Sequence, residues 1–423
     1  MKKPSDCFIP AEILLPDSQK TDMSKWAVVA CDQYTSEPEY WESAIAYVNG
    51  APSTLSMILP EVWLEEGDAR VPSIHAAMEE ALKNTLVAHP DALVLLERTQ
   101  SDGKCRKGLI GAVDLECYDY HKGSTSLIRA TEGTVLERIP PRVKIRRGAP
   151  LELPHVMLLI DDPDRTVIEP LLAESKDAPV LYDTDLMLHG GHARATLVAK
   201  EKAAGIKAAL DALVTPEALG ARYGDCEVAP LLFAVGDGNH SLATAKAAYE
   251  EIKAAIGEAA ALSHPARYAL AEIVNLHDTA LEFEPIYRVV FDADTDDLLS
   301  ALQEELSALH GNAAPQTITV VRGEEEFDLT VNTPVSQLAV GTLQAFLARY
   351  SEAHPTVTVD YIHGVDSLRT LAARKNAVGF LFDGMKKDEL FRTVIYDGAL
   401  PRKTFSMGHA PDKRYYMECR KIK

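Results

Sequence analysis

No apolar run in the sequence approaches the ~20 residues that a helix needs to span a bilayer. Residues 1–20 contain three lysines but no continuous apolar core, so they do not resemble a signal peptide. The six cysteines are scattered, and no two of them form a CxxC pair. Reduced, mostly buried thiols fit this spacing best. These absences predict a cytoplasmic protein without a membrane segment.

Basic residues are scarce relative to acidic ones, since 43 lysines and arginines against 63 aspartates and glutamates give a net charge of −20. Binding to DNA, RNA or an anionic membrane depends on a basic surface that neutralises phosphates. The overall charge therefore argues against a nucleic-acid partner, although a local basic patch is compatible with it.

The glycine fingerprints of familiar nucleotide-binding folds are absent from the most informative turn. The stretch PLLFAVGDGNHSLATAKAAYEEIK, residues 230–253, contains neither G-x-x-x-x-G-K-[ST] nor G-x-G-x-x-G. Instead, the strand-like run Leu231–Val235 leads directly into Gly236–Ser241, which we call the corner. Apolar residues then recur at spacings of 3, 4, 3 and 4, which predicts a helix packed on a sheet: Leu242, Ala245, Tyr249, Ile252 and Ile256.

The residue types at the corner suit an anionic ligand. The first turn of a helix has unsatisfied N–H donors and a partly positive end, which attract phosphate or carboxylate groups. Gly236 and Gly238 would let a ligand approach the main chain. Asp237 has the chemistry to accept a proton, hold a metal or bind a hydroxyl, and His240 that of an acid, a base or a donor to an anion. In the structural alternative, Asp237 or Asn239 caps the helix, the glycines form the turn, and His240 is solvated.

The pattern along the whole chain is mixed α/β. Before Pro285 it predicts a buried strand at 26–31, a helix at 73–88, strands at 92–97, 107–116 and 155–160, a hairpin turning at 190–191, and a helix at 203–213. After Pro285 it predicts a helix at 296–310, strands at 317–321 and 327–331, a helix at 340–350, strands at 357–361 and 377–382, and a helix at 387–394. We therefore expect two domains, at 1–290 and 291–423.

Four stretches resemble a widespread, uncharacterised bacterial family called domain of unknown function 1015. They are FAVGDGNHSLATA at the corner, RATEGTVLERIPPRV (129–143), RYALAEIVNLHDTALEFEPIYRVV (267–290) and GALPRKTFSM (398–407). The resemblance implies a relation to the ParB/sulfiredoxin-like superfamily, whose matching corner holds nucleotide phosphates. It therefore implies a ParB/sulfiredoxin-like core followed by a second, smaller C-terminal α/β lobe.

Two corner residues depart from the pattern of that family. Asn239 stands where the family has His, and Ser241 stands where it has Arg. Arginine clamps a phosphate with two hydrogen bonds, whereas serine offers one hydroxyl. The resemblance makes Arg288 and Lys403 candidates for the missing positive charge.

The resemblance also implies roles for Glu132, as a general base, and for Thr134, as a hydroxyl ligand. We expect both residues to converge with Arg288 and Lys403 on a pocket at the corner. The catalytic candidates are then Asp237, His240 and Glu132, and the ligand-binding candidates are Gly236, Gly238, Asn239, Ser241, Thr134, Arg288 and Lys403. No residue is assigned to a metal.

Two weaker constellations have simpler structural explanations. His189 and His192, preceded by Asp183 and Asp185, suggest a metal site, but a hairpin turn explains the intervening glycines more simply. Cys31 follows an expected strand end and suggests a nucleophile, but a structural thiol is favoured.

Two classes of function fit the sequence. One is a phosphotransferase, a nucleotide-dependent small-molecule kinase, that uses ATP or ADP with Mg²⁺ and positions a phosphorylated small molecule at the corner. The alternative is a non-catalytic regulator that binds a nucleotide or another metabolite. A sulfiredoxin-like reaction needs a reactive cysteine at the corner, and Gly236–Ser241 contains none.

Overall fold

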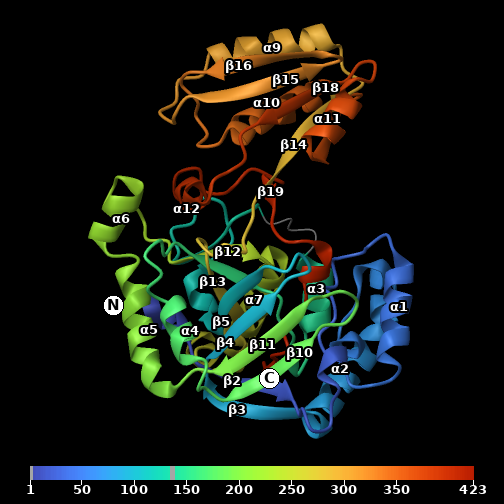
Figure 1. Ribbon diagram of the computed structural model, residues 1–423, viewed down its shortest axis with the longest axis vertical. Helices are drawn as coiled ribbons and strands as arrows, with labels where there is room; N and C mark the ends of the chain where they lie inside the picture. Colours follow the sequence, from blue (N-terminus) through green and yellow to red (C-terminus); the bar gives the residue numbers. More distant parts are fainter. Residues whose placement is uncertain (1–2, 134–138) are drawn as a thin grey trace. The chain divides into compact units, whose positions relative to one another are not determined.

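The computed structural model describes residues 3–133 and 139–423, which form two compact units (Figure 1). Within these residues, unit 1 comprises 3–130, 139–281 and 408–423, and unit 2 comprises 131–133 and 282–407. The boundary expected after residue 290 differs from this division. Residues 408–423 belong to unit 1 because their backbone pairs there, for example Cys419 with Leu14 and Arg420 with Glu152.

A mixed sheet of ten strands forms the centre of unit 1, in the order β10-β11-β4-β5-β13-β9-β12-β7-β6, with β1 beside β5. Its strands are β1 (Phe8–Ile9), β4 (Val94–Thr99), β5 (Cys105–Asp114), β6 (Tyr118–Asp119), β7 (Ile128–Ala130), β9 (Met157–Ile160), β10 (Val180–Asp185), β11 (His192–Leu197), β12 (Phe233–Asp237) and β13 (Tyr268–Asn275). Two short pairs complete unit 1: β2 (Ala11–Pro16) with β3 (Leu86–Ala92), and β8 (Leu151–Glu152) with β20 (Arg420–Lys421). Strand β12 lies inside the main sheet, between antiparallel β9 and parallel β7.

Both faces of the main sheet are buried, which explains why its strands read as nearly continuous apolar runs. Leu109 and Ile110 are neighbours on β5 but belong to two different core clusters. Since alternate residues of a strand point to opposite faces, the two clusters lie on opposite sides of the sheet. Helix α7 (Asn239–Ile256) covers one side, where its Leu242 and Tyr249 join the cluster of Leu109.

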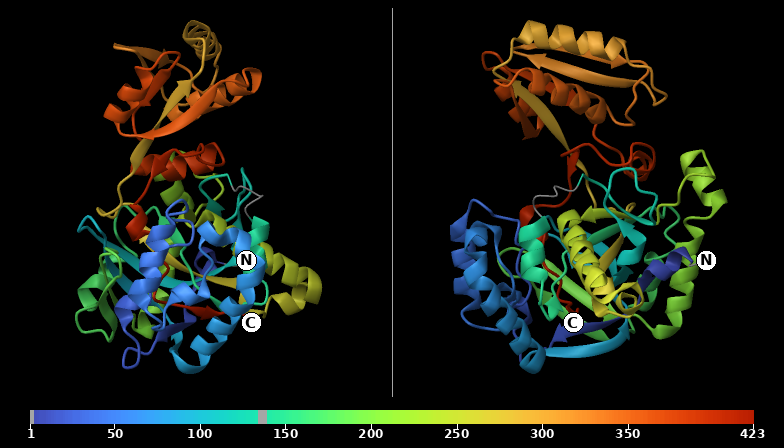
Figure 2. Two further views of the ribbon diagram at one scale, coloured as in Figure 1. Left: turned by 90° about the vertical axis from the view of Figure 1, so that its right-hand side faces the viewer. Right: turned by 180° about the vertical axis from the view of Figure 1, so that it is seen from behind.

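The other α-helices of unit 1 are α1 (Pro38–Val48), α2 (Gly67–Asn84), α3 (Ile139–Arg146), α4 (Glu169–Glu174), α5 (Ala203–Ala212), α6 (Pro216–Tyr223) and α8 (Glu258–Ala261). Figure 2 shows α3 beside α7, where Ile139 and Val143 pack against Ala243 and Ala248. No helix in the described part of the chain is long and apolar enough to cross a bilayer.

Unit 2 contains a second sheet, in the order β16-β15-β18-β14-β17, with β19 beside β14. Its strands are β14 (Glu284–Phe291), β15 (Gln316–Arg322), β16 (Glu325–Val331), β17 (Thr358–His363), β18 (Val378–Phe382) and β19 (Phe405–Ser406). Its helices are α9 (Thr295–Ser307), α10 (Ala339–Ala353), α11 (Val365–Ala372) and α12 (Lys387–Tyr396). Leu368 and Ala372 of α11 pack against Val289 and Val321 of the sheet.

The mixed α/β class is confirmed, and three local predictions are wrong. Residues 26–31 are largely buried but form one isolated bridge, between Val29 and Arg414, instead of a strand. The helix expected at 73–88 spans Gly67–Asn84 instead. Pro72 lies in its second turn and does not mark its start. Ile256, expected on the buried face of α7, is 46% exposed at the end of that helix.

Candidate functional site

The corner has the strand–turn–helix geometry that the sequence predicts. Strand β12 ends at Asp237, Gly238 adopts a left-handed conformation with φ of 83°, and α7 begins at Asn239. A Cβ atom on Gly238 would lie 2.2 Å from the carbonyl oxygen of His155. Glycine is therefore required here both for the backbone angle and for the close approach of the segment before β9.

The capping alternative for the corner is wrong. The N-cap of α7 is Gly238, which has no side chain to cap the helix. The Asp237 carboxylate accepts instead from the Gly238 N–H, at 2.8 Å, one residue before the helix. His240 is half-buried rather than fully solvated, and Ser241 is exposed. The helix thus starts without the serine, threonine, asparagine or aspartate side chain that usually caps this position.

Asp237 faces two cationic side chains. Its Oδ2 lies 3.3 Å from His155 Nε2 and 3.5 Å from Lys413 Nζ. Burial by itself would raise the pKa of the Asp237 carboxyl, but the charges of Lys413 and His155 outweigh it and hold that pKa well below its ordinary value. Asp237 is therefore ionised throughout the physiological pH range.

The two partners of His155 favour a proton on each of its ring nitrogens. Its Nδ1 lies 2.8 Å from the carbonyl oxygen of Arg414, which only accepts, so Nδ1–H is the donor. Nε2 then faces the Asp237 carboxylate, which also only accepts, so it too must carry hydrogen. Burial lowers the pKa of His155, but the Asp237 charge outweighs it, and the pKa is raised. Asp237 and His155 form an ion pair rather than a neutral hydrogen bond.

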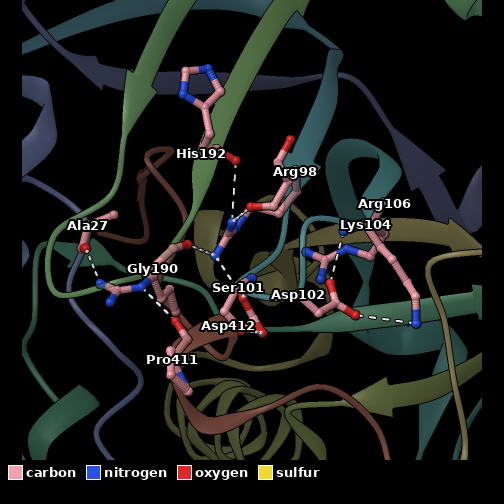
Figure 3. A network of polar contacts seen from close by, with 12 residues as sticks. Ala27, Arg98, Ser101, Asp102, Lys104, Arg106, Gly190, His192, Pro411 and Asp412 are labelled. Atoms are coloured by element: carbon pink, nitrogen blue, oxygen red, sulfur yellow. Dashed lines mark hydrogen bonds and ion pairs between the residues drawn. The ribbon is translucent and has the colours of Figure 1, made fainter.

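Lys413 reaches Asp237 because its neighbours are fixed inside unit 1. The backbone of Lys413 accepts from Ala30 N–H at 2.7 Å. On one side, the buried Asp412 accepts from the N–H and the hydroxyl of Ser101, at 2.7 and 2.6 Å (Figure 3). On the other side, the buried Arg414 donates to the carbonyl oxygen of Ala27, at 3.0 Å. Nothing in the local sequence pattern around Lys413 or His155 indicated this arrangement.

The segment that contains Cys31 lies beside the same ion pair. The charge of Asp32 acts on both His155 and Cys31. Burial raises the pKa of the Cys31 thiol to about 11, and Tyr415 hydrogen-bonds it. A protonated thiol is a poor nucleophile, so the structural interpretation of Cys31 fits and the nucleophilic one does not.

Solvent access at the corner stays a prediction. A cavity of about 20 Å³, room for a single water molecule, is lined by His155, Arg98 and Arg414 together with apolar side chains. Two larger hollows, about 640 Å³ beside α1 and α2 and about 380 Å³ beside α4 and β11, are not lined by the corner.

Three of the four residues expected to converge on the corner lie in unit 2. Arg288 is on β14 and is fully buried. Lys403 is exposed, and the carbonyl oxygens of Arg402 and Lys403 accept hydrogen bonds from Arg288 at 2.8 and 3.1 Å. Glu132 forms a bridge with Leu400 in the same region. Unit 2 thus brings these three segments together, while their convergence on the corner stays a prediction. Thr134 lies outside the described residues.

A family comparison identifies the chain. The family described as "Protein of unknown function (DUF1015)" matches residues 11–366. The chain belongs to this family. The match includes the corner, Glu132 and Arg288, whereas Lys403 and Lys413 lie beyond it. No curated protein matches the chain.

Several solved structures resemble this DUF1015 protein weakly. A conserved hypothetical protein from Pyrococcus furiosus is 10% identical, with a TM-score of 0.34, 70% of this chain covered and 90% of that chain. Free serine kinase in complex with AMP is 12% identical, with a TM-score of 0.35 and coverages of 70% and 86%. SbnI with C-terminal truncation, from Staphylococcus aureus, is 10% identical, with a TM-score of 0.34 and coverages of 71% and 82%. TM-scores this low carry no argument about fold or function.

The histidine–glycine motif of this DUF1015 protein forms the predicted hairpin, β10–β11. His192 donates from its two ring nitrogens to Asp185 and Asp183, at 2.8 and 2.7 Å, so it is not a metal ligand in this arrangement. The two glycines also make room for neighbours, because a Cβ atom on Gly190 would lie 2.2 Å from Nε of Arg414. The described residues contain no cluster of three or more acidic, histidine or cysteine side chains suited to a metal ion.

Proposed function

We propose that the corner Gly236–Ser241 binds the phosphate group of a small-molecule ligand, in the simplest case a nucleotide such as ATP or ADP. One observation carries the proposal: a five-turn helix begins at a left-handed glycine, Gly238, directly beside an ionised Asp237 and two cations. The donors and the dipole at such a helix start attract phosphate. The ParB/sulfiredoxin-like core implied by the resemblance is part of the same proposal.

Lys413 is the cation that we assign to the charge missing at Ser241. Lys413 Nζ lies 3.5 Å from the Asp237 carboxylate, which His155 and the Gly238 N–H also contact, so we propose that its ammonium is shared with a second anion. Its side chain is 26% exposed, so part of it reaches solvent. Lys413 lies in the same unit as the corner, whereas Arg288 and Lys403, the cations expected from the sequence, belong to unit 2.

For the chemistry, we propose a kinase-like phosphotransfer with Asp237, His240 and Glu132 as catalytic candidates. An ionised Asp237 suits Mg²⁺, which proteins commonly hold through one or two carboxylates together with substrate phosphates and water. Bound Mg²⁺ would neutralise charge on the phosphates. The low pKa of Asp237 makes it a weak base, since efficient general bases have a pKa near the working pH. That property favours the second candidate, a non-catalytic nucleotide- or metabolite-binding regulator.

Calorimetric titration of the full chain tests the binding proposal. We expect ATP or ADP to bind at least tenfold more tightly than adenosine, with Mg²⁺ strengthening the binding. Asp237→Asn should remove the Mg²⁺ effect, whereas the control Asp91→Asn, at an exposed ion pair with Lys200, should not. Equal affinity for ATP, ADP and adenosine, or no binding at all, would overturn the proposal. Product formation from ATP with a panel of hydroxyl-bearing small molecules then separates the kinase from the regulator.

A further inference from the structure

Arg288 of unit 2 is buried without a compensating carboxylate. Its side chain is fully inaccessible, and within residues 3–133 and 139–423 no aspartate or glutamate forms an ion pair with it. Burial lowers its pKa to about 10. Because burying an uncompensated charge is unfavourable, the guanidinium must make contacts that repay the loss of water.

The contacts of Arg288 fix one surface turn. Its Nη2 donates to the carbonyl oxygens of Arg402 and Lys403, at 2.8 and 3.1 Å, and its Nε donates to Gln344 Oε1 at 2.8 Å. The turn is held in an unusual shape, since Lys403 has a φ of 51°, in the left-handed region. Arg288 binds the carbonyl oxygens of Arg402 and Lys403 from the buried side, whereas the side chains of both residues are exposed to solvent.

Three cations gather around one aromatic ring in this part of unit 2. The guanidinium carbon of Arg288 lies 4.6 Å from the ring centroid of Tyr361, its partner on the neighbouring strand β17. Lys403 Nζ lies 4.7 Å and the guanidinium carbon of Arg402 lies 6.0 Å from the same centroid. Such contacts order the two exposed side chains.

The cluster is unusual in a chain with a net charge of −20. Among the described residues, neither Arg402 nor Lys403 is paired with a carboxylate, although acidic side chains outnumber basic ones. Two acidic residues pair with backbone on either side of the turn, Glu132 with Leu400 and Glu284 with Ser406. Concentrated positive charge on an acidic protein attracts small anions to that place.

We propose that Arg402 and Lys403, ordered by Tyr361, form a second anion site that binds the phosphate group of a small molecule, and that Arg288 is its positioning residue. The guanidinium group of an arginine can donate two parallel hydrogen bonds to a phosphate, and the ammonium group of a lysine adds a compact positive charge. Arg288 itself does not touch the ligand, because it is buried beneath the turn. This site does not depend on the function proposed for the corner.

Site-specific lysine acetylation of the full chain, read by mass spectrometry, tests the proposal. Inorganic phosphate and AMP serve as probes, and adenosine serves as the probe without phosphate. Phosphate or AMP should slow acetylation of Lys403 at least fivefold, while adenosine should not. Lys375, an exposed lysine of the same unit, should react at an unchanged rate. Protection by AMP but not by inorganic phosphate would identify an organic phosphate as the ligand, and protection by both would identify the phosphate group alone as sufficient.

Variants separate this site from the corner. Arg402→Gln should remove most of the protection of Lys403, and Asp237→Asn, at the corner, should leave it unchanged. Arg288→Lys keeps the charge but loses the fork that holds two carbonyl oxygens, so protection should fall although the melting temperature stays within a few degrees. Unprotected Lys403 in the parent protein, or full protection in Arg402→Gln, would overturn the proposal. If Arg288→Lys fails to fold, the parent and Arg402→Gln still decide the site.

Discussion

The carboxylate of Asp237 lies 3.3 Å from the imidazole of His155, across the ends of two antiparallel neighbours, β12 and β9. The carbonyl of Arg414 fixes the other side of the imidazole, so the ring is protonated and the carboxylate is ionised. Each residue thereby sets the charge of the other. This relationship makes the corner a charged site whose behaviour depends on pH.

The first prediction concerns the titration of His155. The Asp237 charge raises the folded-state pKa of His155, so the resulting stability is fully present below about 6.5, the unperturbed value, and is lost as the pH rises through the folded-state pKa. Asp237→Asn should lower the His155 pKa and flatten this alkaline loss. NMR titration of the ring and urea unfolding between pH 6 and pH 9 measure both effects. An unchanged His155 titration in Asp237→Asn would contradict the ion pair.

The second prediction concerns Gly238, where a side chain meets both backbone strain and the His155 carbonyl. Gly238→Ala should reduce the free energy of unfolding by about 3–4 kcal/mol. The matched control is Gly224→Ala, because Gly224 is also left-handed, with φ of 82°, but has open space around it. That control should cost only about 1–2 kcal/mol. Equal losses in the two variants, measured by urea unfolding, would show that the close contact is unimportant.

The third prediction concerns cysteine reactivity. Burial raises the pKa of Cys31 to about 11, so almost no thiolate is present at pH 7. Cys226 is exposed. We expect iodoacetamide to modify Cys226 more than tenfold faster than Cys31 at pH 7, with the rate at Cys31 rising steadily up to pH 10. Peptide mapping by mass spectrometry gives both rates. Fast modification of Cys31 at pH 7 would contradict the raised pKa and support a nucleophilic role for this residue.

The fourth prediction concerns the buried contacts that fix the C-terminal segment. Asp412→Asn should lower the free energy of unfolding by about 1.5–3 kcal/mol, because the buried carboxylate accepts two hydrogen bonds from Ser101 and lies 3.7 Å from Arg98. Asp102→Asn is the control, since Asp102 is exposed and pairs with its neighbour Lys104 (Figure 3). It should change stability by no more than about 0.5 kcal/mol. Thermal unfolding distinguishes the two variants.

Local sequence patterns predicted the elements in which the buried apolar residues recur at one regular spacing. The 3.6-residue spacing of Leu242 and Tyr249 predicted α7, and the apolar run before Gly236 predicted β12. The same patterns did not predict the structure of short or irregular segments. Helix α11 was not predicted, because Val365–Ala372 offers only two turns of pattern. The apolar run at 26–31 predicts a strand, which is wrong because an apolar run does not show whether its backbone finds more than one pairing partner.

The sequence by itself determined that a glycine turn at Gly236–Ser241 joins a strand to a helix, and family membership follows from it as well. Only the tertiary structure decided what Asp237 does there. His155 reaches it because β9 runs antiparallel to β12, and Lys413 reaches it because the C-terminal segment pairs with Ala30. Local pattern encodes which face of an element is buried, whereas ion pairs between distant segments depend on how the strands pair in space.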